Sequence, residues 1–202
     1  MKSEERHELQ KNELDKVANR AISLYDRYQN QILWGIVVVL LGMAGWIYIV
    51  RSSRVAAESA WTDLEQAGAP AEYLDVSSNF PKSSAAGVAK LQAALAMLET
   101  GVRASFSDRE QADVQLKDAR RAFEELIEVP NLDKNVREQA LYGLAQTLES
   151  ISGGDTEAAV KAYENLLKEF PESLYKEQAE FRIADLKKPG TQEFLAWYQK
   201  QN

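Results

Sequence analysis

Side chains able to carry out covalent or acid–base chemistry are scarce in this chain. It has no cysteine, and its only histidine, His7, precedes a long apolar run. Nucleophile–base pairs and the common zinc sites need Cys or His side chains brought together, so neither can be assembled beyond that run. Carboxylates such as Glu124, Glu125 and Glu128 remain, but they lie in an Ala-rich helical pattern typical of a solvated face. We therefore expect no enzyme, no catalytic residues, no metal site and no cofactor.

The charge of the chain is concentrated after the apolar run. Of the formal net charge of −7, none comes from residues 1–31, which hold six basic and six acidic side chains. The rest of the chain is therefore acidic, which is the opposite of the electrostatic footprint that nucleic-acid binding requires. We exclude nucleic acid as a partner.

The apolar run extends from Ile32 to Val50, 19 residues without a charge. As a helix it would be about 28 Å long, which is close to the thickness of the bilayer hydrocarbon core. Because 31 residues precede it and Arg51 and Arg54 follow it directly, the run is unlike a cleaved signal peptide. The sequence predicts a single transmembrane anchor at residues 32–50, and the alternative is the core helix of a soluble domain.

Basic residues near the anchor predict its orientation. Six Lys or Arg side chains precede the run, and only Arg51 and Arg54 follow it before Lys82. The positive-inside rule then places the N-terminus in the cytoplasm. Residues 1–31, with apolar side chains at helical spacing, form an amphipathic cytoplasmic head, and the remainder lies outside. We expect a single-pass membrane protein whose main domain is extracytoplasmic.

Beyond the anchor the sequence predicts an all-α domain. Long stretches are rich in Ala, Leu, Glu, Lys and Gln, and turns are marked by Gly or Pro. Ser107 and Glu110 have the spacing of a capping box, and Gly153-Gly154-Asp155 combines a helix stop with an N-cap. We assign residues 51–79 to connecting helices and residues 80–202 to a repeat domain.

An internal repeat carries the main inference about the fold. Three segments share the pattern Ala-x-bulky-x-apolar-Ala: AKLQAA at 89–94, ALYGLA at 140–145 and AEFRIA at 179–184. A second pattern follows two of them, with a small, an aromatic and an aliphatic residue spaced by four and three positions. The residues that we expect to pack the repeats together are Ala89, Ala94, Ala140, Ala145, Ala179, Ala184, Phe123, Tyr163 and Leu166. These patterns predict helix–turn–helix units that stack on one another.

The segment GGDTEAAVKAYENLLKEFP, residues 153–171, resembles the second half of a tetratricopeptide repeat. Residues 32–188, with one anchor and about three degenerate repeats, resemble the single-pass ancillary subunits of the Sec translocon that carry a tetratricopeptide-like domain, although the 31-residue head is longer than that family usually has. This resemblance implies an α-solenoid closed by a C-terminal capping helix, TQEFLAWYQKQN. It also implies a bacterial inner-membrane protein that acts as an adaptor in the periplasm, at the protein-export translocon and its chaperones.

The repeat pattern also suggests where a partner binds. In stacked repeats the first helices line a concave wall that accepts a peptide or a helix. By the repeat pattern, the candidate residues on that wall are Tyr142, Phe181, Leu91, Gln139, Gln146 and Gln178. The alternative is that Leu91, Tyr142 and Phe181 are packing residues between units.

Two functions fit these observations. The first is a membrane-anchored protein-interaction adaptor whose extracytoplasmic domain binds other envelope proteins, such as translocon subunits or export chaperones. The second is an envelope-organising scaffold that self-associates as a homo-oligomer and is linked to cell-wall or division machinery. The sequence leaves both open.

Overall fold

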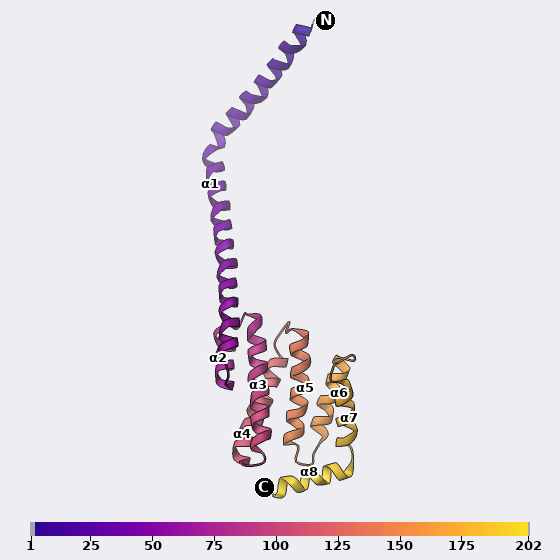
Figure 1. The fold of residues 1–202 in the computed structure, drawn as a ribbon. Coiled ribbons are helices and arrows are strands. Elements are labelled where there is room, and N and C mark those ends of the chain that lie inside the picture. Colours follow the sequence, from indigo (N-terminus) through magenta and orange to yellow (C-terminus); the bar gives the residue numbers. More distant parts are fainter. Residues whose placement is uncertain (1–2, 202) are drawn as a thin grey trace. The chain divides into compact units, whose positions relative to one another are not determined.

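The fold was analysed in a computed structural model, which describes the backbone of residues 3–201 and the side chains from Tyr28 to Lys200, apart from those of residues 29, 32 and 53. Within residues 3–201 the chain forms eight α-helices and no strand (Figure 1). The helices are α1 (Ser3–Gln66), α2 (Pro70–Asn79), α3 (Ser84–Ala104), α4 (Arg109–Ile127), α5 (Lys134–Ile151), α6 (Glu157–Glu169), α7 (Lys176–Leu186) and α8 (Pro189–Gln201). The predicted all-α fold class is confirmed.

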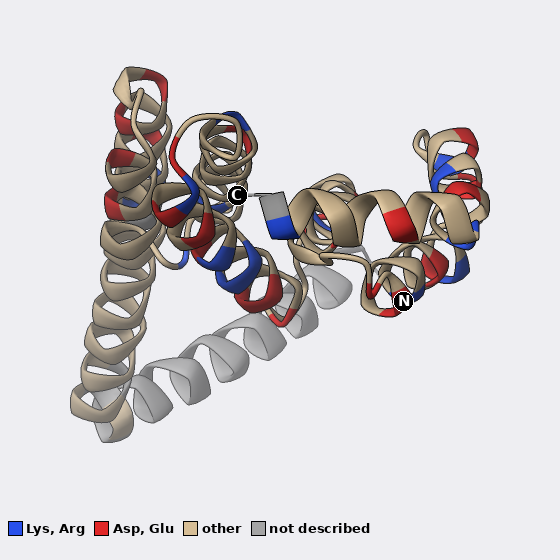
Figure 2. Ribbon diagram, turned by 90° about the horizontal axis from the view of Figure 1, so that it is seen from below, with Lys and Arg blue, Asp and Glu red and all other residues tan. Residues whose placement is uncertain are grey.

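Contacts divide the chain into two units, Met1–Arg54 and Val55–Asn202. The first unit consists of the larger part of α1, and the described part of this helix is long and apolar enough to cross a membrane. Within the described residues, none of its apolar window is buried. Figure 2 shows the corresponding stretch of α1 without blue or red along most of its length. The amphipathic character expected of residues 1–31 depends mostly on side chains that lie outside the described ones.

The second unit begins earlier than residue 80, where the sequence placed the start of the repeat domain. Pro70 occupies the first turn of α2, and the Glu72 carboxylate accepts hydrogen bonds from the backbone N–H groups of Gly68 and Ala69 at 2.7 and 3.1 Å. The helix built on this cap packs against α3, and Val76 is its buried residue. The connecting segment therefore belongs to the helical unit from Val55 onward.

Helices α3 to α7 pack in chain order, each against the next, and α3 also lies beside α5 (Figure 1). Turns between them are set by local chemistry. The carboxylate of Asp133 caps α5 by accepting from the N–H groups of Asn135 and Val136, and Gly153 and Gly154 adopt positive φ angles of 54° and 107° between α5 and α6. The predicted glycine stop is confirmed, but the N-cap of α6 is Thr156 and not Asp155.

Two hydrophobic clusters form the core of this unit. One joins α3, α4 and the start of α5 around Phe123, and the other joins α5, α6 and α7 around Tyr163. Small residues allow neighbouring helices to approach closely. At Gly143 of α5, for example, a Cβ would lie 2.6 Å from Phe123 Cε1 of α4. The buried members of the predicted packing set are Ala89, Ala94, Ala140, Ala145, Ala179, Phe123, Tyr163 and Leu166.

Ala184 is the exception in that set, because it is exposed. In α5 the corresponding residue, Ala145, is covered by α6 in the second cluster. Among the described helices, α8 does not cover α7 in the way that α6 covers α5, because it turns away after Leu186 and lies across the ends of the other helices (Figure 1). The prediction that Ala184 packs between helices is therefore wrong.

Candidate functional site

The surface formed by α5 and α7 holds three of the six predicted partner-binding residues. Tyr142, Gln146 and Glu149 recur on α5 at spacings of four and three, and Tyr175, Gln178 and Arg182 recur at three and four along α7 and its N-cap. Residues at such spacings share one side of a helix. The α5–α7 face is defined by these six residues.

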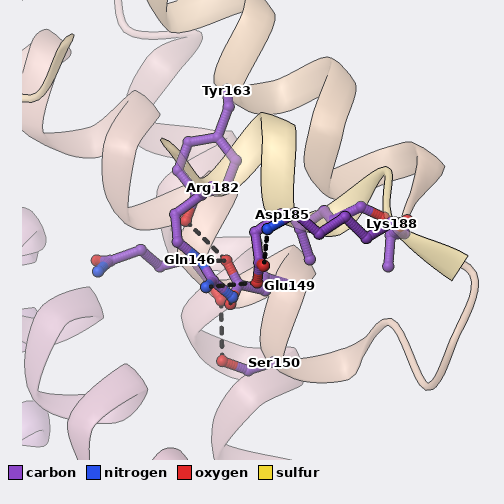
Figure 3. A network of polar contacts seen from close by, with 9 residues as sticks. Gln146, Glu149, Ser150, Tyr163, Arg182, Asp185 and Lys188 are labelled. Atoms are coloured by element: carbon purple, nitrogen blue, oxygen red, sulfur yellow. Dashed lines mark hydrogen bonds and ion pairs between the residues drawn. The ribbon is translucent and has the colours of Figure 1, made fainter. Parts of the chain in front are cut away.

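A partly buried carboxylate of this face, Glu149, joins three helices. Glu149 Oε2 accepts hydrogen bonds from Tyr163 Oη at 3.0 Å and from Arg182 Nε at 3.1 Å, and Arg182 Nη2 also pairs with Glu149 Oε1 (Figure 3). Arg182 Nη1 donates in addition to Asp185 Oδ2 at 3.2 Å. Because the three partners come from α5, α6 and α7, the Glu149–Tyr163–Arg182 network fixes the relative position of these helices.

The electrostatics of this network make it structural. Burial, reinforced by the negative charge of Glu149, raises the pKa of the Tyr163 hydroxyl far above its usual value. The hydrogen bond to Glu149 raises the pKa of Arg182. At neutral pH the tyrosine is therefore a neutral donor and the arginine a cation, and both are already engaged with the same carboxylate.

A pair of stacked tyrosines lies on the same face. The rings of Tyr142 and Tyr175 stack with a centroid distance of 4.2 Å and an interplanar angle of 9°. Tyr175 is held there by its own turn: its N–H donates to Ser173 Oγ at 3.0 Å, and Ser173 Oγ in turn donates to Glu138 Oε1 at 2.5 Å. Both rings are partly exposed, so the stack offers a rigid apolar surface with hydroxyl groups at its edge.

Polar groups around the stack are unpaired. The side chains of Gln139, Gln146 and Gln178 make no hydrogen bond with the rest of the described chain, and all three are at least partly exposed. A free amide can donate and accept at once, which suits contact with the backbone or side chains of another protein. Burial, with a smaller effect of the Glu149 charge, raises the pKa of Tyr142, so its hydroxyl also stays protonated.

Two other predicted site residues lie elsewhere. Leu91 is only 2% exposed and belongs to the core cluster of α3 and α4, so its assignment to a binding wall is wrong. It faces α4 because Ala94 and Leu98 on the same side of α3 are buried there as well. Phe181 is 63% exposed on α7, next to Arg182 but outside the six residues of the α5–α7 face.

Two parts of the site have no signal in the sequence. Tyr175 lies outside every repeated pattern, in the turn before α7. Glu149 and Arg182 are 33 residues apart and are joined only in the folded structure. A residue pair of this kind follows from tertiary packing and has no local spacing rule.

Within the described residues, no group of three or more His, Cys, Asp or Glu side chains is arranged to hold a metal ion. Comparison with protein-family models, curated proteins and solved structures gives no match for this chain.

Proposed function

We propose that the protein is a single-pass, membrane-anchored adaptor that binds another protein on its α5–α7 face. In this proposal α3–α7 form about three degenerate tetratricopeptide-like units, α8 is the C-terminal capping helix, and the apolar part of α1 is the anchor. The observation that carries the proposal is the composition of the face: a rigid, partly exposed tyrosine stack beside glutamine amides without partners in the described chain. Aromatic rings supply contact area at low entropic cost, and free amides supply hydrogen bonds.

The Glu149–Tyr163–Arg182 network also supports this proposal. Glu149, Tyr163 and Arg182 satisfy one another, so binding need not break them and their helices stay in place. A face that is already ordered loses little entropy when a partner binds. Under the resemblance to ancillary translocon subunits, the partner is a protein of the export machinery or one of its chaperones, on the extracytoplasmic side of the inner membrane.

Site-specific photo-crosslinking in living cells tests the proposal. A photoreactive amino acid at Gln178, exposed on the face, is compared with the same probe at Asn165, which is exposed on α6. We expect adducts to another protein from position 178 and not from position 165, with mass spectrometry identifying the partner. Adducts to export proteins support the narrower proposal. Equal labelling from both positions, or none from position 178, would contradict a binding site on this face.

A double substitution tests whether the partner contacts Tyr142 and Gln146 or only lies close to Gln178. Replacing both Gln146 and Tyr142 by alanine removes an amide and one ring of the stack while leaving the Glu149 network intact. We expect crosslinking from position 178 to fall about tenfold or more, as for the loss of one aromatic anchor and one hydrogen bond at an interface. The matched control is Asn165→Ala on α6. If the double substitution leaves the adduct unchanged, the partner contacts α7 alone.

A further inference from the structure

Helix α8 is fixed to the second unit by one of its sides. Tyr198 Oη donates to the Ser105 carbonyl at 3.0 Å, and Gln192 Nε2 donates to the Leu186 carbonyl at 3.0 Å. The turn before α6 approaches α8 closely, because a Cβ at Gly154 would lie 2.8 Å from Ala196 Cβ. Leu195 packs on the second hydrophobic cluster. These contacts set the orientation of α8 within this unit.

The opposite side of α8 carries two large aromatic side chains without cover. Phe194 is 58% exposed and Trp197 is 55% exposed, and their rings are 6.0 Å apart. Phe194 also stacks against Tyr198, with a centroid distance of 6.4 Å, so the inner side of α8 holds the outer aromatic pair in place. The pair is consequently a preformed surface.

The same aromatic spacing is buried elsewhere in this fold. Phe194 and Trp197 repeat the three-residue step between Tyr163 and Leu166 of α6, both of which are fully or almost fully buried. On α6 that side is covered by neighbouring helices within the second cluster. The pattern on α8 is thus the one that this fold uses for helix–helix contact, and here the covering helix is missing from the described chain.

Charges flanking the aromatic pair indicate what the covering helix is. Glu193 lies four residues before Trp197 and Lys200 lies three residues after it, so all three share one stripe. Both charged side chains are exposed, and neither forms an ion pair within the described residues. A second α8 that runs antiparallel to the first places its Lys200 opposite Glu193 of the first, and its Glu193 opposite Lys200 of the first. The charges of this stripe are therefore complementary to those of a second copy.

We propose that two copies of this chain associate through α8, antiparallel about a two-fold axis near Trp197. The two aromatic pairs pack on each other, and Glu193 of each copy pairs with Lys200 of the other. This isologous arrangement pairs Glu193 and Lys200 of both copies, which gives two ion pairs, and it closes after two copies. An anionic lipid surface is disfavoured as the occupant, since residues 51–202 carry the entire net charge of −7.

The dimer is weak in solution and depends on the membrane. One pair of short helices buries less than the roughly 1,200–2,000 Å² of a standard stable interface. Chains held in the same bilayer by the apolar stretch of α1 have a high effective concentration, which raises the population of a weak contact without any new interaction. The test therefore uses the full chain in native membranes.

Cysteine crosslinking tests the antiparallel geometry. Because the chain has no cysteine, introduced thiols are the only ones present. Full-length Glu193→Cys and Lys200→Cys chains with different tags are co-expressed and oxidised in isolated membranes. We expect the mixed disulfide to dominate, because like positions are separated by about 10 Å along the helix axis, beyond the reach of a disulfide. A majority of like pairs, or no disulfide at all, overturns the proposal.

Charge reversal provides an independent readout. Energy transfer between fluorophores at the C-terminus of full-length chains reports association in membranes. Glu193→Lys alone should weaken association about fivefold, and adding Lys200→Glu should restore it. Glu172→Lys, an exposed charge in the turn before α7, is the matched control and should have no effect. If the single reversal is silent or the double fails to recover, the pairing is wrong. Crosslinking from Gln178 is measured in parallel and tests the adaptor function separately.

Discussion

The contact between Gly143 of α5 and Phe123 of α4 determines how closely the first two helix pairs can approach. The Phe123 ring is fully buried, and a Cβ at Gly143 would lie 2.6 Å from its Cε1 and 3.1 Å from its Cε2. Gly143→Ala therefore forces the ring or the backbone to shift. Overpacking of this kind costs about 1–3 kcal/mol, while the gain in helix propensity from Gly to Ala offsets roughly 1 kcal/mol.

We expect Gly143→Ala to lower the free energy of unfolding by about 1 kcal/mol in total. For a unit of this size the melting temperature falls by roughly 2–4 °C per kcal/mol. Near-UV circular dichroism of the full chain in detergent micelles measures the transition, because it reports the packing of buried aromatic rings. Gly190→Ala on α8 is the matched control. No heavy atom lies within 4 Å of a Cβ at Gly190, so this change should be neutral or slightly stabilising.

A second background isolates the steric cause. Phe123→Leu removes the ring atoms that the new methyl group meets, at a cost of its own from the lost apolar contact. In that background Gly143→Ala should become stabilising by about 0.5–1 kcal/mol, since only the propensity gain remains. If Gly143→Ala has the same effect with Phe123 and with Leu at this position, the two residues do not constrain each other and the packing argument fails.

Two further predictions concern buried hydroxyl groups. Tyr163→Phe removes the donor to Glu149 and should lower the free energy of unfolding by about 1 kcal/mol in urea titrations. The pKa of Tyr163 is raised in the folded chain, whereas in the unfolded chain this tyrosine ionises at about pH 10. Its contribution to the free energy of unfolding is therefore complete below about pH 10 and falls as the pH rises further. The Phe variant should lose less stability at alkaline pH, and an equal loss would refute this. Thr156→Val removes a buried hydroxyl that donates to the Leu186 carbonyl at 2.9 Å and accepts from Gln192. It should cost about 1 kcal/mol in the same titration, whereas Thr156→Ser should restore most of it.

Regular features of the fold could be predicted from the sequence. Helical periodicity and the apolar run are local patterns, so the all-α class and the long apolar helix followed from them directly. The buried small and aromatic residues, such as Ala159 and Tyr163, followed from a repeated spacing. Helix boundaries were less certain: Ser107 and Glu110 have the spacing of a capping box, yet Asp108 is the N-cap of α4, accepting from Gln111 N–H at 3.0 Å.

The candidate site was predicted only in part. Gln146 and Tyr142 lie on the α5–α7 face because their positions follow from the period of α5. Leu91 occupies the same position in its motif but is buried, because α4 covers that side of α3. The same motif position is thus partly exposed in α5, at Tyr142, and buried in α3, at Leu91. The difference depends on the neighbouring helices and not on the motif itself.

The end of the helical stack has a physical cause in the sequence of α7. The offset of 39 residues between the motifs of α5 and α7 aligns Leu141 with Glu180 and Leu148 with Lys187. In α5 both leucines contribute to the cluster shared with α6, whereas Glu180 and Lys187 are exposed. A helix packed along α7 in the manner of α6 would bury these charges at considerable cost.

Helix α8 therefore crosses the ends of the other helices and does not pair along α7 (Figure 1). On its inner side, Tyr198 donates to the Ser105 carbonyl and Gln192 donates to the Leu186 carbonyl, so α8 is tied to the C-terminal end of α3 and to the end of α7. The consequence is that the aromatic pattern used for burial on α4 and α6 faces outward on α8. Substituting leucine at Glu180 and Lys187 together should test this cause. If charge is what keeps α8 off α7, fluorescence of Trp197 should shift to shorter wavelength as its ring becomes covered; an unchanged spectrum would mean that the short connection after Leu186 sets the direction of α8.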